Sequence, residues 1–407
     1  MRPLVGRRLW LVGIGGAGMS ALAAVAKAWG AEVAGSDRAR SLYTELLDAE
    51  GIPVTIGHSA RSVPAGWEVV ASSAISPDNP ELAGGFRRRG DLLAELVALR
   101  PSIVVAGAHG KTTTAAMIAF ALDRLGLDPA FLVGGPVPQL GGNARAGEGW
   151  LVAEGDESDR SLELLRPRIA VVTNVELDHH ATFASQAEVE ELFERWLDSL
   201  GPDAVVIRGA DVESPESLEL AVPGEHNRRN AACAVAALAA AGVAPEDAAR
   251  VLAGFRGAGR RFEARGEAGG VRVFDDYGHH PTEVAATLAA ARAVADGGRI
   301  LVLFQPHLFS RTRHLARELA VALAAADAAC LTDIYPAREV PVPGVSGKLV
   351  ADRLAELRPG MPVGWAPRLE DAAALVAGQA RPGDLILTVG AGDVDRAGPL
   401  VLERLAR

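Results

Sequence analysis

A short glycine-rich stretch with one lysine is the part of the chain best suited to chemistry. The stretch contains Gly107, His109, Gly110, Lys111, Thr112 and Thr113. It lies between an apolar run, residues 103–106, and a helix-like segment, residues 115–125. A strand, a glycine loop and a helix in that order turn backbone N–H groups toward a phosphate, while a lysine balances its charge and a hydroxyl reaches Mg²⁺. The usual spacing would place a glycine at Val105, so the loop predicts phosphate binding with an unusual spacing.

Acidic and imidazole side chains follow the next apolar runs. Glu154 comes directly after residues 149–153, and the segment from Thr173 to His179 comes after residues 169–173. Ligands of doubly wound sheets bind at such strand ends. Carboxylate, hydroxyl and phosphate oxygens are what Mg²⁺ prefers, and an imidazole is an occasional extra ligand. Zinc is disfavoured because no cysteine or HExxH partner accompanies the histidines.

A third group of reactive side chains lies in the last part of the sequence. It contains Arg261, Asp276, Tyr277, His279 and Arg311. Acids beside histidines suit proton handling or the orientation of an amine near neutral pH. Guanidinium groups suit phosphate or carboxylate, to which they can bond in bidentate fashion.

Glycines also follow the first apolar run. Gly13, Gly15 and Gly18, with Asp37 about 20 residues further on, have the form of a dinucleotide fingerprint. The glycines let a backbone approach a diphosphate at a helix N-terminus. A nucleotide-sugar diphosphate fits that requirement as well as NAD does, so both readings stay open here.

The composition narrows the class of protein. The chain has 407 residues and a net charge of −10, and an acidic balance argues against a nucleic-acid partner. Its two cysteines, Cys233 and Cys330, lie in apolar segments, which predicts buried thiols and a reducing cytoplasm. No signal-peptide pattern is seen at the start, and the longest alanine-rich run is shorter than the roughly 20 residues that a membrane helix needs.

The elements that must position these residues alternate between strand and helix. Strands are expected at residues 9–12, 32–34, 54–56, 69–71, 103–106, 149–153, 169–173, 204–207, 271–274, 300–304, 328–332 and 385–389. Helices are expected between them, among them residues 230–241, 245–252, 281–295 and 312–326. This alternation predicts an α/β fold with parallel sheets in three domains, residues 1–99, 100–256 and 257–407.

Taken in order, these motifs resemble the Mur ligase family over nearly the whole chain. The matching segments are residues 13–21, 72–81, 107–114, 154–158, 173–179, 227–230, 259–263 and 275–283. The family's ATP loop also lacks the first glycine. The string from Asp275 to Glu283 is the most specific, and it resembles the family branch that adds L-alanine to UDP-N-acetylmuramate.

The resemblance implies an ATP-dependent ligase of peptidoglycan precursor synthesis with three domains. Residues 1–99 would form a Rossmann-like domain for the UDP-sugar, residues 100–256 a central P-loop domain with a mixed sheet for ATP, and residues 257–407 a Rossmann-like domain for the amino acid. ATP would phosphorylate the muramoyl carboxylate, and the alanine amine would displace the phosphate. We expect small-molecule substrates, no nucleic acid, no membrane, a cytoplasmic location, and a monomer or homodimer.

The resemblance also implies roles for the matching residues. For ATP they are Gly107, His109, Gly110, Lys111, Thr112, Thr113, His226, Asn227, Asn230 and Arg261. For the UDP-sugar they are Gly15, Gly16, Gly18, Met19, Ser20, His58, Ser72 and Ser73. For Mg²⁺ they are Thr112, Glu154 and His179, and for the amino acid Tyr277, His279 and Arg311. The catalytic set is Lys111, Glu154, His179, Asp276 and His279.

One departure keeps alternatives open. Leu308 stands where the family generally has an arginine expected near the alanine carboxylate, and Arg313 is a candidate substitute. A Mur-family ligase with another acceptor, of the murein-tripeptide recycling type, has the same mechanism. A catalytically degenerate nucleotide-binding relative is a second alternative, and an NAD-dependent oxidoreductase would explain only the first glycine motif.

Overall fold

The computed structural model describes residues 2–180, 182–215, 218–337 and 339–407. It contains three sheets built from successive parts of the chain. Contacts divide the chain into two compact units. The first contains residues 1–177, 182–221 and 229–258, and the second contains residues 178–181, 222–228 and 259–407. The predicted α/β class with three sheets is confirmed, while the domain limits stay a prediction.

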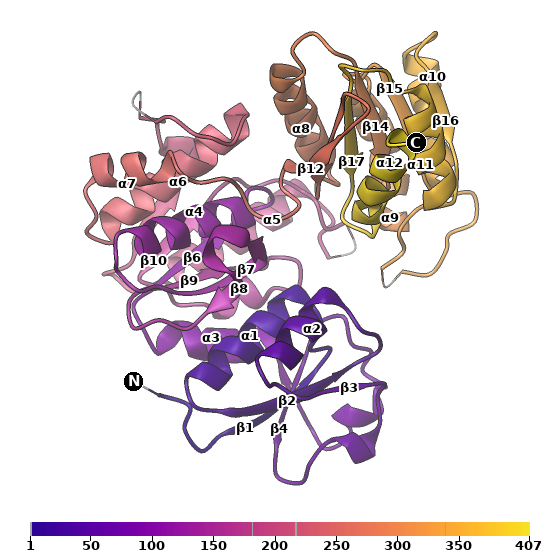
Figure 1. Ribbon diagram of the computed structural model, residues 1–407. Coiled ribbons are helices and arrows are strands. Elements are labelled where there is room, and N and C mark those ends of the chain that lie inside the picture. Colours follow the sequence, from indigo (N-terminus) through magenta and orange to yellow (C-terminus); the bar gives the residue numbers. More distant parts are fainter. Residues whose placement is uncertain (1, 181, 216–217, 338) are drawn as a thin grey trace. The chain divides into compact units, whose positions relative to one another are not determined.

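The first sheet begins the first unit. Its strands are β1 (Arg8–Val12), β2 (Glu32–Asp37), β3 (Val54–Ile56), β4 (Glu68–Ala71) and β5 (Arg87–Arg88). They are parallel, in the order β3-β2-β1-β4-β5. Helices α1 (Ala17–Ala28), α2 (Leu42–Ala49) and α3 (Arg89–Ala98) lie on one face (Figure 1). Leu9 and Leu11 of β1 pack there, whereas Trp10 and Val12 face the opposite side and pack with Leu82. The alternation along β1 thus buries both faces of the sheet.

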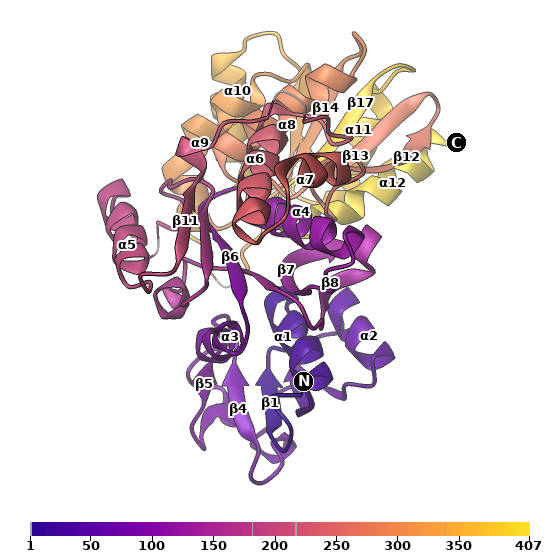
Figure 2. The ribbon, with the colours of Figure 1, turned by 90° about the vertical axis from the view of Figure 1, so that its left-hand side faces the viewer.

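The second sheet belongs to the same unit. Its strands are β6 (Ser102–Ala106), β7 (Ala130–Val137), β8 (Gly142–Arg145), β9 (Leu151–Glu154), β10 (Ile169–Val172) and β11 (Val205–Arg208). The order is β11-β10-β6-β9-β7-β8, with only the β7–β8 pair antiparallel, so the predicted mixed sheet is present. Helix α4 (Lys111–Arg124) and helix α5 (Gln186–Asp198) flank these strands (Figure 2). Helices α6 (Glu225–Ala240) and α7 (Pro245–Leu252) follow.

The third sheet lies in the second unit. Its strands are β12 (Glu263–Ala268), β13 (Val271–Asp276), β14 (Ile300–Phe304), β15 (Ala328–Leu331), β16 (Val363–Trp365) and β17 (Leu385–Val389). The order is β12-β13-β17-β14-β15-β16, and only β12 runs antiparallel to its neighbour. Helices α8 (Pro281–Val294), α9 (Phe309–Leu323) and α10 (Gly347–Leu357) pack on one face, and α11 (Leu369–Gln379) and α12 (Ala397–Leu405) on the other. This is the doubly wound arrangement of a Rossmann-like domain.

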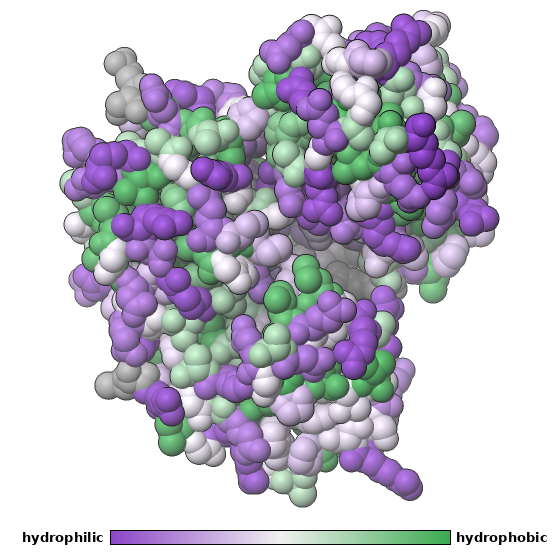
Figure 3. Space-filling model, viewed as in Figure 1, coloured by the Kyte–Doolittle hydropathy of each residue, from purple (hydrophilic) through white to green (hydrophobic). Residues whose placement is uncertain are grey.

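The visible surface is mostly hydrophilic, with apolar residues scattered over it (Figure 3). Such scattered exposure is ordinary for a globular chain. Among the described residues, none of the helices combines the length and the apolar character needed to cross a membrane.

Candidate active site

The glycine loop connects β6 to α4, as the sequence predicts. Gly107 has a φ of +132°, and a Cβ there would lie 2.2 Å from Oγ1 of Thr173. Gly110, the residue that precedes α4, has a φ of +81°, and a Cβ there would lie 2.3 Å from Oδ1 of Asn230. Both positions therefore need glycine, for the backbone angle and for the close approach. The first-turn amides of α4 begin at Lys111, where a phosphate would bind.

The chain itself fixes the backbone of this loop. Oδ1 of Asn174 accepts from N–H of His109 at 2.9 Å, and Nδ2 of Asn174 donates to the carbonyl of His109 at 2.9 Å. Oγ1 of Thr173 donates to that carbonyl at 2.6 Å. The ring of His109 is held as well, since its Nε2 lies 2.9 Å from Oε2 of Glu176. The segment after β10 thus acts as a clamp on the loop after β6, its neighbour in the sheet.

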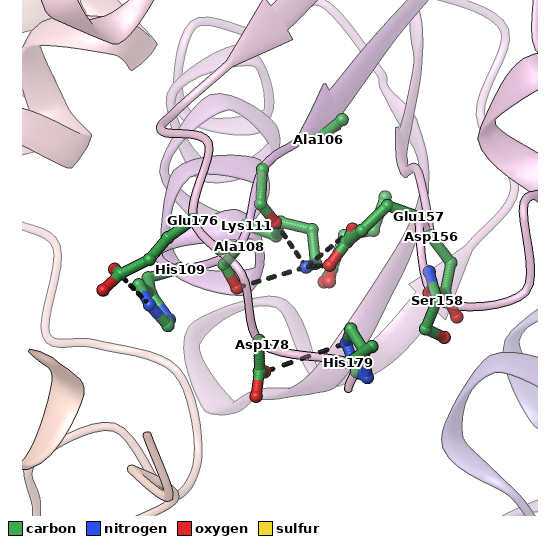
Figure 4. A network of polar contacts seen from close by, with 12 residues as sticks. Ala106, Ala108, His109, Lys111, Asp156, Glu157, Ser158, Glu176, Asp178 and His179 are labelled. Atoms are coloured by element: carbon green, nitrogen blue, oxygen red, sulfur yellow. Dashed lines mark hydrogen bonds and ion pairs between the residues drawn. The ribbon is translucent and has the colours of Figure 1, made fainter. Parts of the chain in front are cut away.

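Lys111 occupies the centre of a polar network (Figure 4). Its Nζ donates to both carboxylate oxygens of Glu157 at 3.1 Å and to the carbonyl of Ala108 at 3.3 Å. Burial lowers the pKa of Lys111, but the charges of Glu157 and Asp156 outweigh it, so the pKa lies above its ordinary value. The ammonium is therefore charged at neutral pH and already held at the loop.

Glu154 is the last residue of β9 and contacts the start of α4. Its Oε2 accepts from Oγ1 of Thr112 at 3.1 Å, and its Oε1 accepts from N–H of Gly134. A carboxylate and a hydroxyl in contact at the start of α4 are a donor set that suits Mg²⁺. The predicted pair Glu154 and Thr112 is thus brought together within the first unit, whereas His179 belongs to the second unit.

The predicted nucleotide residues of α6 fall into both units. Asn230 lies against the glycine loop within the first unit. Asn227 and His226 belong to the second unit, where Nδ2 of Asn227 donates to the carbonyl of Pro223 at 2.7 Å. Burial and the charge of Arg261 lower the pKa of His226, so its ring is neutral at pH 7.

The first glycine motif connects β1 to α1. N–H of Gly15 donates to Oδ2 of Asp37 at 2.8 Å, so this amide serves the loop itself. Gly16 precedes α1 with no side-chain cap, which leaves the first amides of the helix for an anion. Met19 is buried in the core, and Oγ of Ser20 donates to the carbonyl of Ala17 at 2.9 Å. Those two side chains therefore hold the helix in place.

The remaining predicted UDP-sugar residues follow neighbouring strands of the same sheet. His58 comes after β3, and Ser72 and Ser73 come directly after β4. The carboxyl ends of parallel strands meet at one edge, so these residues share it with Gly13 to Gly18. Their role in binding a UDP-sugar stays a prediction.

The two neighbouring arginines after residue 259 have different surroundings. Arg260 donates from Nε to Asp275 at 2.9 Å, and from Nη1 and Nη2 to the carbonyls of Gly392 and Gly390 at 2.8 and 2.7 Å. Its hydrogen bonds hold β13 to the loop after β17. The guanidinium of Arg261 lies 4.9 Å from the ring centre of Tyr277. Arg261 makes no hydrogen bond with any residue that the structure describes, and it is therefore the one suited to a ligand.

Asp276 is the last residue of β13, and Tyr277 follows it directly. Oδ1 of Asp276 accepts from N–H of Gly278 at 2.8 Å and Oγ1 of Thr287 at 3.0 Å, while Oδ2 accepts from N–H of Phe262 at 2.8 Å. Burial raises the pKa of Asp276 above its ordinary value. These bonds tie together the loops on which Tyr277 and Arg261 stand, so Asp276 shapes this part of the site.

Asp178, His279 and Arg311 form a buried cluster in the second unit. Oδ1 of Asp178 accepts from Nε and Nη2 of Arg311 at 2.7 and 2.6 Å, and Oδ2 lies 3.5 Å from Nε2 of His279. Nε2 of His179 lies 3.8 Å from Oδ2 of Asp178 (Figure 4). Nδ1 of His307 accepts from Nη1 of Arg311 at 3.0 Å when the ring is neutral. Burial raises the pKa of Asp178, but the hydrogen bond from His279 and the charge of Arg311 hold it well below its usual range.

The departure at Leu308 has a structural counterpart. Leu308 precedes α9 with φ +69° and ψ 135°, a conformation that side-chain-bearing residues rarely adopt. Arg313, the candidate substitute, is exposed, and its Nη2 lies 3.4 Å from Nε2 of His314. Arg311 is thus the buried guanidinium of α9, and Arg313 does not join it.

Three residues that contact a predicted residue within their own unit were absent from the predicted set. Glu157 pairs with Lys111, Asn174 clamps the loop, and Asp178 pairs with Arg311. All three lie in the acidic and polar runs that the sequence analysis singled out after β9 and β10. The signal was present, but a run of polar letters does not tell which member reaches which partner.

Comparison with protein families gives matches to successive parts of the chain. The "Mur ligase family, catalytic domain" matches residues 9–96, the "Mur ligase middle domain" residues 105–217, and the "Mur ligase, glutamate ligase domain" residues 260–392. Their order is the order of the three sheets.

Individual relatives match over the full length. The chain is 43% identical to the UDP-N-acetylmuramate–L-alanine ligase of Streptomyces coelicolor, covering 100% of this chain and 99% of the relative. It is 42% identical to the enzyme of the same name from Rubrobacter xylanophilus, covering 98% and 100%. Among solved structures, the UDP-N-acetylmuramate-alanine ligase of Thermotoga maritima is similar, with a TM-score of 0.83, 28% identity and 98% of each chain covered. A murein peptide ligase from Psychrobacter arcticus has the same fold, with a TM-score of 0.70 at 24% identity over 99% of each chain.

Proposed function

This chain belongs to the Mur ligase family, and on that premise we propose that it joins L-alanine to the carboxylate of UDP-N-acetylmuramate with ATP. The observation that carries the proposal is the likeness to alanine-adding ligases along the entire chain. The geometry supports it, since β6, β9 and β10 bring a phosphate loop, a paired lysine and a carboxylate–hydroxyl pair to one edge of the second sheet.

The reaction needs an activated carboxylate. A carboxylate is a poor electrophile, and transfer of the γ-phosphoryl group of ATP gives an acyl phosphate and ADP. The amine nitrogen of alanine then attacks the carbonyl carbon, a proton leaves the nitrogen, and phosphate departs as the amide forms. The protein must therefore stabilise charge on a phosphoryl group and orient an amine.

The phosphate loop performs the first task in this proposal. Gly110, Thr112 and Thr113 would present backbone amides and hydroxyls at the start of α4, while Gly107 and His109 give the loop its shape. Lys111 supplies a fixed positive charge, because its ammonium is held by Glu157 and the loop carbonyls. A phosphate at this loop would share Lys111 with Glu157, which limits how tightly the free nucleotide binds.

Thr112 and Glu154 would hold Mg²⁺, and His179 is the third proposed ligand. The hydrogen bond between Thr112 and Glu154 fits this ion, because both side chains offer oxygen atoms at the loop. When bound, Mg²⁺ neutralises charge on phosphate oxygens. Gly134 keeps the carboxylate of Glu154 turned toward Thr112 through its amide.

The other nucleotide contacts are assigned by the same resemblance. His226, Asn227 and Asn230 would contact the adenine, and Arg261 the phosphates. A neutral His226 suits a hydrogen bond to a base, since it keeps one ring nitrogen as an acceptor. Arg261 is suited to phosphate because its guanidinium makes no hydrogen bond with an oxygen of the described residues.

Tyr277, His279 and Arg311 would bind the amino acid. Arg311 offers a buried positive charge, which suits the alanine carboxylate, and its Nε and Nη2 are oriented by Asp178. Asp276 acts on this site by holding the loops of Tyr277 and Arg261. With Leu308 in place of a second arginine, recognition of the carboxylate would rest on Arg311.

The UDP-sugar would bind at the carboxyl edge of the first sheet. Gly16 and Gly18 let its diphosphate approach the first amides of α1, while Gly15, Met19 and Ser20 shape that loop. His58, Ser72 and Ser73 would lie toward the uridine. We further propose a cytoplasmic enzyme of peptidoglycan precursor synthesis that acts as a monomer or homodimer, without nucleic-acid or membrane partners.

One assay tests the proposal. Phosphate release from ATP is measured with UDP-N-acetylmuramate and, separately, L-alanine, glycine, L-serine or a murein tripeptide. Turnover with L-alanine is expected. Turnover with the tripeptide alone would instead support a recycling ligase, and absence of turnover despite UDP-sugar binding would support a degenerate relative.

A further inference from the structure

A fully buried carboxylate lies beside the proposed uridine edge of the first sheet. The side chain of Glu81, which stands in the short turn after β4, is 0% exposed. Its Oε1 accepts from N–H of Ser59 at 3.1 Å, and its Oε2 accepts from the hydroxyl of Ser36 and lies 3.5 Å from Nε1 of Trp10. Nδ1 of His58 lies 3.3 Å from the same Oε2. Within the described residues, no lysine or arginine appears among its partners, so this carboxylate depends on hydrogen-bond donors.

Because the carboxylate of Glu81 needs hydrogen-bond donors, it determines which nitrogen of His58 carries the proton. Nδ1 faces Oε2 of Glu81 at 3.3 Å and Oγ of Ser36 at 3.1 Å. A carboxylate only accepts, and the single hydroxyl proton of Ser36 is donated to it, so both oxygens turn lone pairs toward Nδ1. Nδ1 must therefore carry the hydrogen. A ring that carries its hydrogen on Nδ1 and none on Nε2 offers Nε2 as an acceptor.

Nε2 is the part of His58 left for another molecule. It makes no hydrogen bond with any described residue, and the side chain is 20% exposed. His58 follows β3, Ser36 is the next-to-last residue of β2, and Glu81 follows β4. These strands end at the edge where a doubly wound sheet binds its ligand.

We infer that Glu81 is a positioning residue for uridine recognition, which acts by holding His58 in the tautomer whose Nε2 accepts a hydrogen bond from the nucleoside. The inference rests on the proposed function, since it takes a UDP-sugar as the substrate. The donor on the ligand is either N3–H of the uracil ring or a ribose hydroxyl. Glu81 itself does not touch the ligand.

The first experiment replaces Glu81 with glutamine, which keeps the size but removes the purely accepting group. The Michaelis constant for UDP-N-acetylmuramate is expected to rise about tenfold, the effect of one lost hydrogen bond, while kcat and the Michaelis constant for ATP stay unchanged. Glu50→Gln, on an exposed residue at the end of α2, is the matched control. A fall in kcat for Glu81→Gln equal to the rise in the Michaelis constant would overturn the inference.

A double mutant tests whether Glu81 acts through His58. In a His58→Ala background, the change Glu81→Gln is expected to have no further effect on UDP binding, measured by calorimetry. Independent, additive effects would contradict the inference. Ser36→Ala is a milder second variant, expected to weaken UDP binding by a smaller factor. If Glu81→Gln does not fold, unchanged binding by Ser36→Ala rejects the inference.

Ligand analogues identify the donor. The affinities of wild type and of His58→Ala are measured for UDP, 2′-deoxy-UDP and N3-methyl-UDP. If wild type binds one analogue more weakly than UDP and His58→Ala does not, the group altered in that analogue is the donor to His58. If wild type and His58→Ala distinguish UDP from its analogues to the same extent, the inference is rejected while the proposed function stands. If the wild-type protein does not bind UDP at all, the inference and the proposed substrate fail together.

Discussion

Arg311 donates from both Nε and Nη2 to a single oxygen of Asp178, at 2.7 and 2.6 Å. The two residues are 133 positions apart, and their side chains are only 3% and 4% exposed. A buried pair of this kind contributes little compared with an apolar pair, but the loss of one partner leaves an uncompensated charge. The pair therefore makes the segment after β10 and the start of α9 dependent on each other.

Asp178→Asn should lower the free energy of unfolding by about 3 kcal/mol, because Arg311 then lacks a charged partner. The folded-state pKa of Asp178 is depressed, so its contribution is present above its ordinary pKa of about 4 and is lost as the pH falls below it. Urea unfolding at several pH values should show the difference from wild type shrinking at acidic pH. Asp203→Asn, on an exposed residue, is the control. A difference that stays constant across this range would contradict the assignment.

Lys111→Ala should reduce phosphate release by at least about a hundredfold, since it removes the fixed positive charge at the loop. Binding of the UDP-sugar, measured by calorimetry, should be retained because we propose that site at the first sheet. Lys348→Ala is a matched control, as this exposed lysine forms an ion pair with Asp352 on α10, away from the glycine loop in the sequence. Loss of UDP-sugar binding together with phosphate release would argue against separate sites.

Gly107→Ala should abolish nucleotide binding and lower stability, because a Cβ there would lie 2.2 Å from Oγ1 of Thr173. Gly126→Ala separates crowding from backbone strain. Gly126 has a φ of +73° with nothing near its Cβ position, so the change should cost about 1 kcal/mol and leave activity unaltered. Thermal unfolding and nucleotide titration of both variants make the comparison. If Gly107→Ala and Gly126→Ala lose the same stability and bind nucleotide equally well, the close contact with Thr173 does not limit the residue at 107.

Substitution of Arg260 should mainly lower stability, whereas substitution of Arg261 should mainly lower nucleotide affinity. Arg260→Gln breaks contacts to Asp275, Gly390 and Gly392 and should lower the free energy of unfolding by about 3 kcal/mol. Arg261→Gln should leave the unfolding midpoint within about a degree of wild type, as for surface substitutions, while nucleotide affinity falls about tenfold. A loss of stability in Arg261→Gln and a loss of nucleotide affinity in Arg260→Gln would contradict this assignment.

The neighbourhood of the glycine loop follows from the sequence because β6, β9 and β10 are parallel strands of the second sheet. Glu154 and Thr173 come after apolar strands, and parallel strands bring their ends to one edge, so their neighbourhood to the glycine loop was predictable. The family of the chain and its α/β class were likewise predicted and are confirmed. The roles of the individual site residues stay predictions.

Other features were not predictable in the same way. The strands β5, β7, β8, β12 and β16 were not expected, since they are short, or lie at sheet edges, or contain glycines, and carry little apolar alternation. Helix α9 begins at Phe309, three residues before the expected start. The pair of Asp178 and Arg311 depends on a contact between distant segments, which local patterns do not contain.

The clamp of Thr173 and Asn174 on the glycine loop has a consequence for the thermodynamics of nucleotide binding. The loop backbone acquires its shape from hydrogen bonds made when the chain folds. Its conformational entropy is therefore lost during folding and does not have to be lost again at association. Asn174→Ala should consequently shift the entropy of nucleotide binding in the unfavourable direction, even though Asn174 belongs to the clamp and not to the loop.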